Sequence, residues 1–129
     1  LRIEYHMLSD TVKRTLFCLG AVESNRDSLV MMEEPETRSF PFYTKFLAER
    51  IALSDNFYIV TTHNPYFLET LVEKIPEGDI SVYLSRASGW ETKYERVDVR
   101  RIREMVAEGA DVFFELGGED EGLCGVLSD

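Results

Sequence analysis

Two short apolar runs, each followed by polar residues, constrain the fold of this chain more than any other feature. Residues 28–33 read Ser-Leu-Val-Met-Met-Glu, and residues 57–61 read Phe-Tyr-Ile-Val-Thr. Such runs are typical of strands buried on both faces of a parallel sheet. Between them, a segment that starts at Pro41 and ends at Asn56 carries apolar side chains at helical spacing. The pattern therefore predicts a strand–helix–strand unit with a right-handed crossover.

The flanking segments extend this unit into an α/β fold. We expect a helix over residues 9–23 with Ser9 as its N-cap, and another over residues 65–75 that follows Asn64-Pro65. Residues 80–86 and 92–97 are expected to form a hairpin around Trp90, before a helix that starts at Asp98. Residues 110–116 fit either a helical turn or a strand. This order of elements predicts an α/β layer fold with at least two parallel strands.

The polar residues after the two runs are expected to meet at one edge of the sheet, because parallel strands bring their carboxyl ends together. The first run leads into Glu33-Glu34-Pro35-Glu36 and the second into Thr61-Thr62-His63. Adjacent carboxylates repel each other, so keeping both ionised requires a cation or a nearby donor. Oxygen ligands suit Mg²⁺, and a second carboxylate could deprotonate a water molecule.

Together these segments resemble the C-terminal lobe of ABC-class P-loop ATPases, in the SMC-like and OLD-like branch of "AAA family ATPases". The run from Leu29 to Glu36 looks like a Walker B segment, and Val60-Thr61-Thr62-His63 looks like the strand that carries the switch histidine. Leu8-Ser9-Asp10, which runs into a helix with Arg14, is similar to the ABC signature motif. The three matches follow the order of the family. The resemblance covers residues 8 to about 85.

The resemblance implies a role for each matched residue. Glu33 corresponds to the Walker B acid that holds Mg²⁺, and Glu34 to the acid that activates the attacking water. His63 corresponds to the switch histidine near the γ-phosphate. Ser9 and Asp10 belong to the signature segment, which meets the nucleotide bound on the opposite subunit. Residues 36–41 match the D-loop, which reaches across a dimer.

The chain also departs from the family pattern. Thr11 and Phe40 stand where the family usually has glycine and often has histidine, and no GxxxxGK[ST] sequence occurs. We therefore expect a three-layer P-loop NTPase-like α/β fold with a mostly parallel sheet, of which residues 1–116 supply only the C-terminal lobe. The Walker A strand is missing from this chain and is expected between the two apolar strands, which should then not be neighbours. Residues 117–129 are expected to form a flexible acidic tail.

The expected cofactors are ATP and Mg²⁺. The expected partners are the missing Walker A lobe, in the same protein or another chain, and a second copy in an ATP-dependent homodimer. The chain begins with Leu1, so we expect it to be a piece of a longer protein, and we expect the isolated piece to be inactive. Of the net charge of −10, −8 lies in residues 104–129, which hold no Lys or Arg. Nucleic acid is therefore expected to bind only other parts of the protein.

No apolar run is long enough to span a membrane, and two distant cysteines suit a reducing cytoplasm. Two other functions stay open. One is a metal-dependent phosphohydrolase or nuclease that uses Glu33, Glu34, Glu36 and His63 without ATP. The other is a non-catalytic interaction module that has lost hydrolysis.

Overall fold

The computed structural model describes residues 4–117, which divide between Ile80 and Ser81 into two compact units. Unit 1 ends at Ile80, unit 2 begins at Ser81, and each is treated by itself. The single lobe over residues 1–116 stays a prediction. The expected acidic tail lies outside the described residues, apart from Gly117, which ends the last helix.

Unit 1 follows the predicted order of elements closely. Ser9 caps the first long helix by accepting a hydrogen bond from the Val12 N–H, and Asn64 caps a later helix through the Phe67 N–H. Prolines occupy the first turns of two helices, where no N–H is needed. The elements of unit 1 are η1 (Tyr5–Met7), α1 (Asp10–Ser24), β1 (Leu29–Glu33), α2 (Pro41–Ala52), β2 (Phe57–Thr61), α3 (Pro65–Lys74) and η2 (Glu77–Asp79).

The two strands of unit 1 pair directly and in parallel, which corrects the expectation that an absent strand separates them. The register runs from Leu29 opposite Phe57 to Glu33 opposite Thr61. The Glu34 N–H extends this ladder by donating to the Thr61 carbonyl at 2.9 Å. Any further strand must therefore join at the outer edge of β1 or of β2, because the inner edges of both strands are already used.

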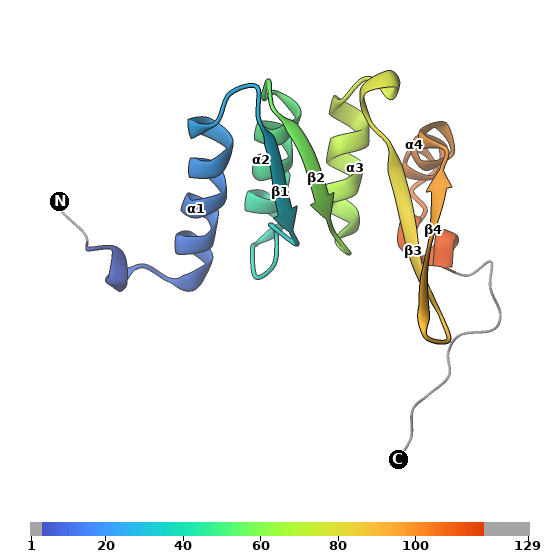
Figure 1. Cartoon of the computed structure of the whole chain (residues 1–129), viewed down its shortest axis with the longest axis horizontal. Helices are drawn as coiled ribbons and strands as arrows, with labels where there is room; N and C mark the ends of the chain where they lie inside the picture. Colours follow the sequence, from blue (N-terminus) through green and yellow to red (C-terminus); the bar gives the residue numbers. More distant parts are fainter. Residues whose placement is uncertain (1–3, 118–129) are drawn as a thin grey trace, which may run out of the picture. The chain divides into compact units, whose positions relative to one another are not determined.

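Helices cover only one face of this sheet. Figure 1 shows α2 behind the two strands, with α1 and α3 to either side. The side chains on the covered face include Met32, Tyr58 and Val60, which pack against the core. On the other face, apolar side chains are exposed: Leu29, Met31, Phe57 and Ile59. The two strands were expected to be buried on both faces of the sheet, but only one face is covered. The helices α1, α2 and α3 all pack against that face, which carries Met32, Tyr58 and Val60.

The core of unit 1 lies between the covered face and the three α-helices. Phe67 is 0% exposed and Leu47 is 2% exposed. They belong to a cluster of buried side chains from α1, α2 and α3: Cys18, Val22, Leu47, Ala48, Ile51, Phe67 and Leu71. This cluster holds the helices against β1 and β2 by burial of apolar surface.

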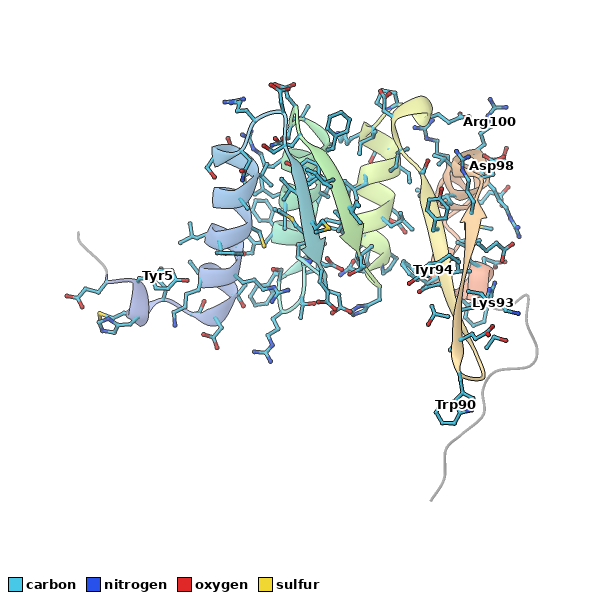
Figure 2. All side chains as sticks on the ribbon, in the orientation of Figure 1. Tyr5, Trp90, Lys93, Tyr94, Asp98 and Arg100 are labelled. Atoms are coloured by element: carbon cyan, nitrogen blue, oxygen red, sulfur yellow. The ribbon has the colours of Figure 1, made fainter. Side chains whose placement is uncertain are left out.

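Unit 2 is an antiparallel hairpin followed by two helices. The elements are β3 (Val82–Ser88), β4 (Glu91–Val97), α4 (Val99–Ala107) and α5 (Val112–Gly117), so the segment that fitted either a helical turn or a strand is helical. Gly89 has a φ of +62° in the hairpin turn, a conformation suited to glycine. Figure 2 shows Trp90 projecting from the tip of the hairpin, where its side chain is fully exposed. Within residues 4–117, no helix is both long enough and apolar enough to cross a lipid bilayer.

Candidate active site at the carboxyl edge of the parallel sheet

A carboxylate and an imidazole from different strands meet where β1 and β2 end. His63 Nδ1 lies 2.9 Å from Glu34 Oε1, within hydrogen-bond distance. Glu34 directly follows β1, and His63 comes two residues after the end of β2. The last residues of the two strands, Glu33 and Thr61, lie opposite each other in the sheet. The parallel pairing therefore brings together the two residues that were predicted to be catalytic.

The backbone turns sharply at Glu34. Its φ of +42° lies in the left-handed region, which residues with a side chain seldom adopt. This turn ends the alternation of side chains along the strand. Glu33 stays on the open face with Leu29 and Met31, whereas Glu34 is directed to His63. Two carboxylates adjacent in sequence thus have different surroundings.

The second oxygen of the Glu34 carboxylate also has a partner. Thr37 Oγ1 donates to Glu34 Oε2 at 2.9 Å. This hydrogen bond, followed by the hydrogen bond from His63, lowers the pKa of the Glu34 carboxyl from its ordinary value. Arg14 contributes a smaller electrostatic effect in the same direction. Glu34 is therefore held in the ionised form that a general base requires.

Glu33 has the position, but not the neighbours, of a complete metal site. No group of three His, Cys, Asp or Glu side chains that could hold a metal ion occurs within residues 4–117. Mg²⁺ in nucleotide enzymes is usually held by one or two carboxylates, with phosphate oxygens and water completing its shell. An exposed carboxylate such as Glu33 fits that kind of site, in which the protein supplies only part of the coordination.

A buried carboxylate, which the sequence did not single out as buried, lies beside the pair. Glu36 is 3% exposed, and its Oε1 accepts a hydrogen bond from Thr62 Oγ1. Its other oxygen, Oε2, is buried without a hydrogen-bond partner among the described residues. Because Thr62 directly precedes His63, the contact joins the turn after β1 to the end of β2. The only sequence signal was the third acid of the Glu-Glu-Pro-Glu run.

Helix α1 begins near this turn and supplies donors to it. Arg14 Nη2 donates to the Glu33 and Glu34 carbonyls at 3.2 and 2.7 Å. Thr11 Oγ1 donates to the Arg38 carbonyl at 2.8 Å. The sequence marks Thr11 only as a departure from the signature motif and Arg14 only as part of the helix after it. Their contacts with the turn are not predicted, because contacts between segments about 20 to 30 residues apart leave no local pattern.

Ser9 and Asp10 stand at the start of α1, where both are exposed. The Ser9 hydroxyl oxygen is used as the N-cap, and Asp10 lies 3.5 Å from Lys13 Nζ. No described contact joins either residue directly to Glu34 or His63. Asp10 nevertheless lines a cavity of about 510 Å³ together with Arg14 and Thr37, both of which form hydrogen bonds with Glu34. The rest of the lining consists of Tyr5, Lys13, Phe17 and Arg38.

Comparison with known proteins gives one informative likeness. No family model matches the chain, and no curated protein matches it. A solved structure from a study of the ATP-driven dimerization and DNA-stimulated activation of SMC ATPases matches with a TM-score of 0.57 and 11% sequence identity. The match covers 81% of this chain and 63% of that one, so this chain spans less than two thirds of the length of the structure it resembles. At this identity the likeness establishes a shared fold at a coarse level.

Proposed function

We propose that this chain is the Walker B and switch part of an SMC-like ABC-type ATPase, which hydrolyses ATP once a Walker A lobe completes the site. The observation that carries the proposal is the Glu34–His63 pair at the carboxyl edge of a parallel sheet, with Glu33 beside it. The coarse likeness to an SMC ATPase structure supports it. The process that hydrolysis would drive, including nucleic-acid repair or defence, rests on the family resemblance alone.

In this proposal the two carboxylates have different tasks. Glu33 would hold Mg²⁺, together with water and the nucleotide phosphates, and the ion would neutralise phosphate charge. Glu34 would accept a proton from the attacking water; His63 and Thr37 occupy one site on each of its oxygens, and a carboxylate offers about four. His63, held by Glu34, would contact the transferred phosphoryl group.

The Walker A lobe is the first partner of this proposal. The open sheet face carries Leu29, Met31, Phe57 and Ile59, and the exposed fractions of these side chains are 62, 73, 72 and 55%. A contiguous apolar face of this kind marks an interaction surface. The outer edges of β1 and β2 also remain free for another strand within unit 1. The absent lobe would cover this face and extend the sheet.

A second copy is the other partner. The N-terminus of α1 attracts anions through its free N–H groups, so Ser9 and Asp10 would meet the nucleotide held by the opposite protomer of an ATP-dependent dimer. Nucleic acid would bind other parts of the complete protein. The alternative of a metal-dependent phosphohydrolase or nuclease is less favoured, because Glu36, one of the carboxylates it would use, is buried and accepts a hydrogen bond from Thr62.

The proposal is tested in the complete protein with Glu34→Gln. Gln cannot accept a proton from water, so ATP hydrolysis should fall by about 10²–10⁴ while Mg-ATP still binds. Glu33→Gln should instead raise the Mg²⁺ concentration that hydrolysis requires. Glu73→Gln is the matched control: it makes the same change on α3, away from the pair, and should hydrolyse ATP normally. Wild-type hydrolysis by the Glu34→Gln variant would show that Glu34 is not the base.

The isolated chain provides a second test. It holds Glu33, Glu34 and His63 but no Gly-rich loop to cradle the phosphates. Titration calorimetry with Mg-ATP should therefore detect weak binding or none. Micromolar affinity of the monomeric chain would place the nucleotide elsewhere and overturn the proposed division into two lobes.

A further inference from the structure

Helix α1 presents a row of donors to the turn that follows β1. Thr11, Arg14 and Cys18 are spaced three and four residues apart, so they lie on one face of the helix. Their polar atoms approach carbonyl oxygens of residues 33–38, including that of Pro35, which lies 3.9 Å from the sulfur of Cys18. We propose that Thr11 and Arg14 are positioning residues that hold this turn in the shape that directs Glu34 to His63.

The turn has a conformation that its own sequence does not favour. Glu34 and Arg38 have φ values of +42° and +63°, although neither is glycine. Such conformations persist where surrounding contacts determine them. Two backbone hydrogen bonds lie within the turn, from the Thr37 N–H to the Glu34 carbonyl and from the Ser39 N–H to the Glu36 carbonyl, and the Thr37 hydroxyl also donates to the Glu34 carboxylate. Further support comes from other elements: residues 61–63 contact Glu34 and Glu36, and α1 contacts the carbonyls of residues 33, 34 and 38.

Arg14 is suited to recognise this backbone shape. A single nitrogen, Nη2, reaches the carbonyls of two successive residues, Glu33 and Glu34. Successive carbonyls of a regular strand point in opposite directions, so both can approach one donor only where the backbone turns. The left-handed conformation of Glu34 therefore creates the paired acceptors, and Arg14 in turn stabilises that conformation.

Thr11 holds the other end of the same turn. Its hydroxyl donates to the Arg38 carbonyl, and Arg38 is the second left-handed residue. This contact gives a local reason for a hydroxyl side chain at position 11. Together, Thr11 and Arg14 fix both ends of the segment that carries Glu34. The structural part of the inference is that Thr11 and Arg14 hold the turn. Its catalytic part, that this positions Glu34 for hydrolysis, rests on the proposed function.

Amide hydrogen exchange, followed by NMR in the 129-residue chain, tests the structural part. Arg14→Met should raise exchange of the Glu34, Thr37 and Ser39 amides roughly tenfold, which corresponds to the net contribution of about one hydrogen bond. Arg14→Lys should restore part of the protection because an ammonium group also donates. Arg50→Met is the matched control, since Arg50 also ties another element to α1, through Glu23, but away from the turn.

Thr11 is tested in the same way. Thr11→Val removes the hydroxyl at constant shape and should speed exchange of the Ser39 amide, whereas Thr11→Ser should not. Thr15→Val is the control, because the Thr15 hydroxyl bonds only the Thr11 carbonyl within the helix. Wild-type exchange at the turn in both Arg14→Met and Thr11→Val would overturn the inference, whatever the ATPase measurements give.

The catalytic part is tested in the complete protein. Arg14→Met should lower kcat for ATP hydrolysis about tenfold with little change in KM, because it misplaces Glu34 and leaves the phosphate-binding Walker A lobe unchanged. Arg50→Met should leave both parameters unchanged. Faster exchange with an unchanged kcat would overturn the catalytic part of the inference, that Thr11 and Arg14 position Glu34 for hydrolysis. A Glu34→Gln variant with normal hydrolysis would overturn the proposed function, and the exchange result would still stand.

Discussion

At the scale of single residues, the charge of Glu34 depends on two neighbours. The Thr37 hydroxyl and the His63 ring, in that order, lower the pKa of this carboxyl. Since the pKa is lower in the folded than in the unfolded chain, ionised Glu34 contributes stability at pH values above its unfolded pKa. That contribution is lost as the pH falls through the folded pKa. The interaction of Glu34 with Thr37 and His63 should therefore make the stability of the chain depend on pH in the acidic range only.

Removing the Thr37 hydroxyl should raise the pKa of Glu34. Thr37→Val removes the hydrogen bond that lowers this pKa most. The midpoint of the Glu34 titration should therefore move up toward the ordinary value of a glutamate. Side-chain carboxyl ¹³C shifts, recorded against pH, measure this midpoint. Thr37→Ser keeps a hydroxyl and should titrate like the wild type. An unchanged midpoint in Thr37→Val would mean that the hydrogen bond to Oε2 does not form in solution.

The buried carboxylate of Glu36 makes Thr62 important for stability. Thr62→Val removes the donor to Glu36 and also the acceptor of the Asn64 N–H. Leaving buried polar groups unpaired costs about 1–3 kcal/mol each, so the free energy of unfolding should fall by at least that amount. Thr61→Val is the matched control at the neighbouring, exposed position, where the change should stay within about 0.5 kcal/mol. Both variants are compared by urea unfolding. Equal midpoints would show that the hydrogen bond between Thr62 and Glu36 does not stabilise the chain.

At the scale of elements, the contrast between the two faces of the β1–β2 sheet can be measured. Phe67 on α3 is completely buried under the covered face, whereas Phe57 on β2 is exposed on the open one. Phe67→Ala should lower the free energy of unfolding of the chain by about 3–5 kcal/mol, the usual cost of a large core cavity. Phe57→Ala should change it by no more than about 0.5 kcal/mol. Equal losses in thermal or urea unfolding would show that both faces are covered in solution.

The elements and the meeting of Glu34 with His63 could be predicted because their signals are local. Ser9, Pro41 and Asn64-Pro65 mark helix starts, and a parallel pair brings its carboxyl ends to one edge. The predicted separation of β1 from β2 was wrong. It was taken from the family resemblance, which implies a Walker A strand between them, and the apolar composition of a strand does not identify its neighbour. The left-handed turn at Glu34 and the burial of Glu36 also depend on contacts with distant segments, which a single sequence does not reveal.

At the scale of the whole molecule, the open sheet face should behave differently in the chain and in the complete protein. Met31→Lys places a charge in the middle of this face. In the isolated chain it should leave the free energy of unfolding nearly unchanged and reduce self-association, since it breaks up an exposed apolar patch. In the complete protein, where we propose that another lobe covers the face, it should cost about 2 kcal/mol or more.

Leu53→Lys is the matched control for this substitution. Leu53 is the C-cap that follows α2 and is as exposed as Met31, but it does not lie on the sheet. It should alter stability little in either form of the protein. Sedimentation and thermal unfolding of the two variants, in both forms, separate a covered sheet face from a general intolerance of charge. Equal tolerance of Met31→Lys in the complete protein would contradict the covering lobe.

The exposure of Trp90 determines what optical spectroscopy can report. It is the single tryptophan of the chain, and at the tip of the hairpin its ring is already surrounded by water. Its fluorescence spectrum in the native chain should therefore resemble that of the denatured chain and give almost no unfolding signal. A shift of this emission to shorter wavelength would instead indicate that another molecule covers the hairpin tip. Trp90 fluorescence can therefore report binding at this tip, although it does not report unfolding.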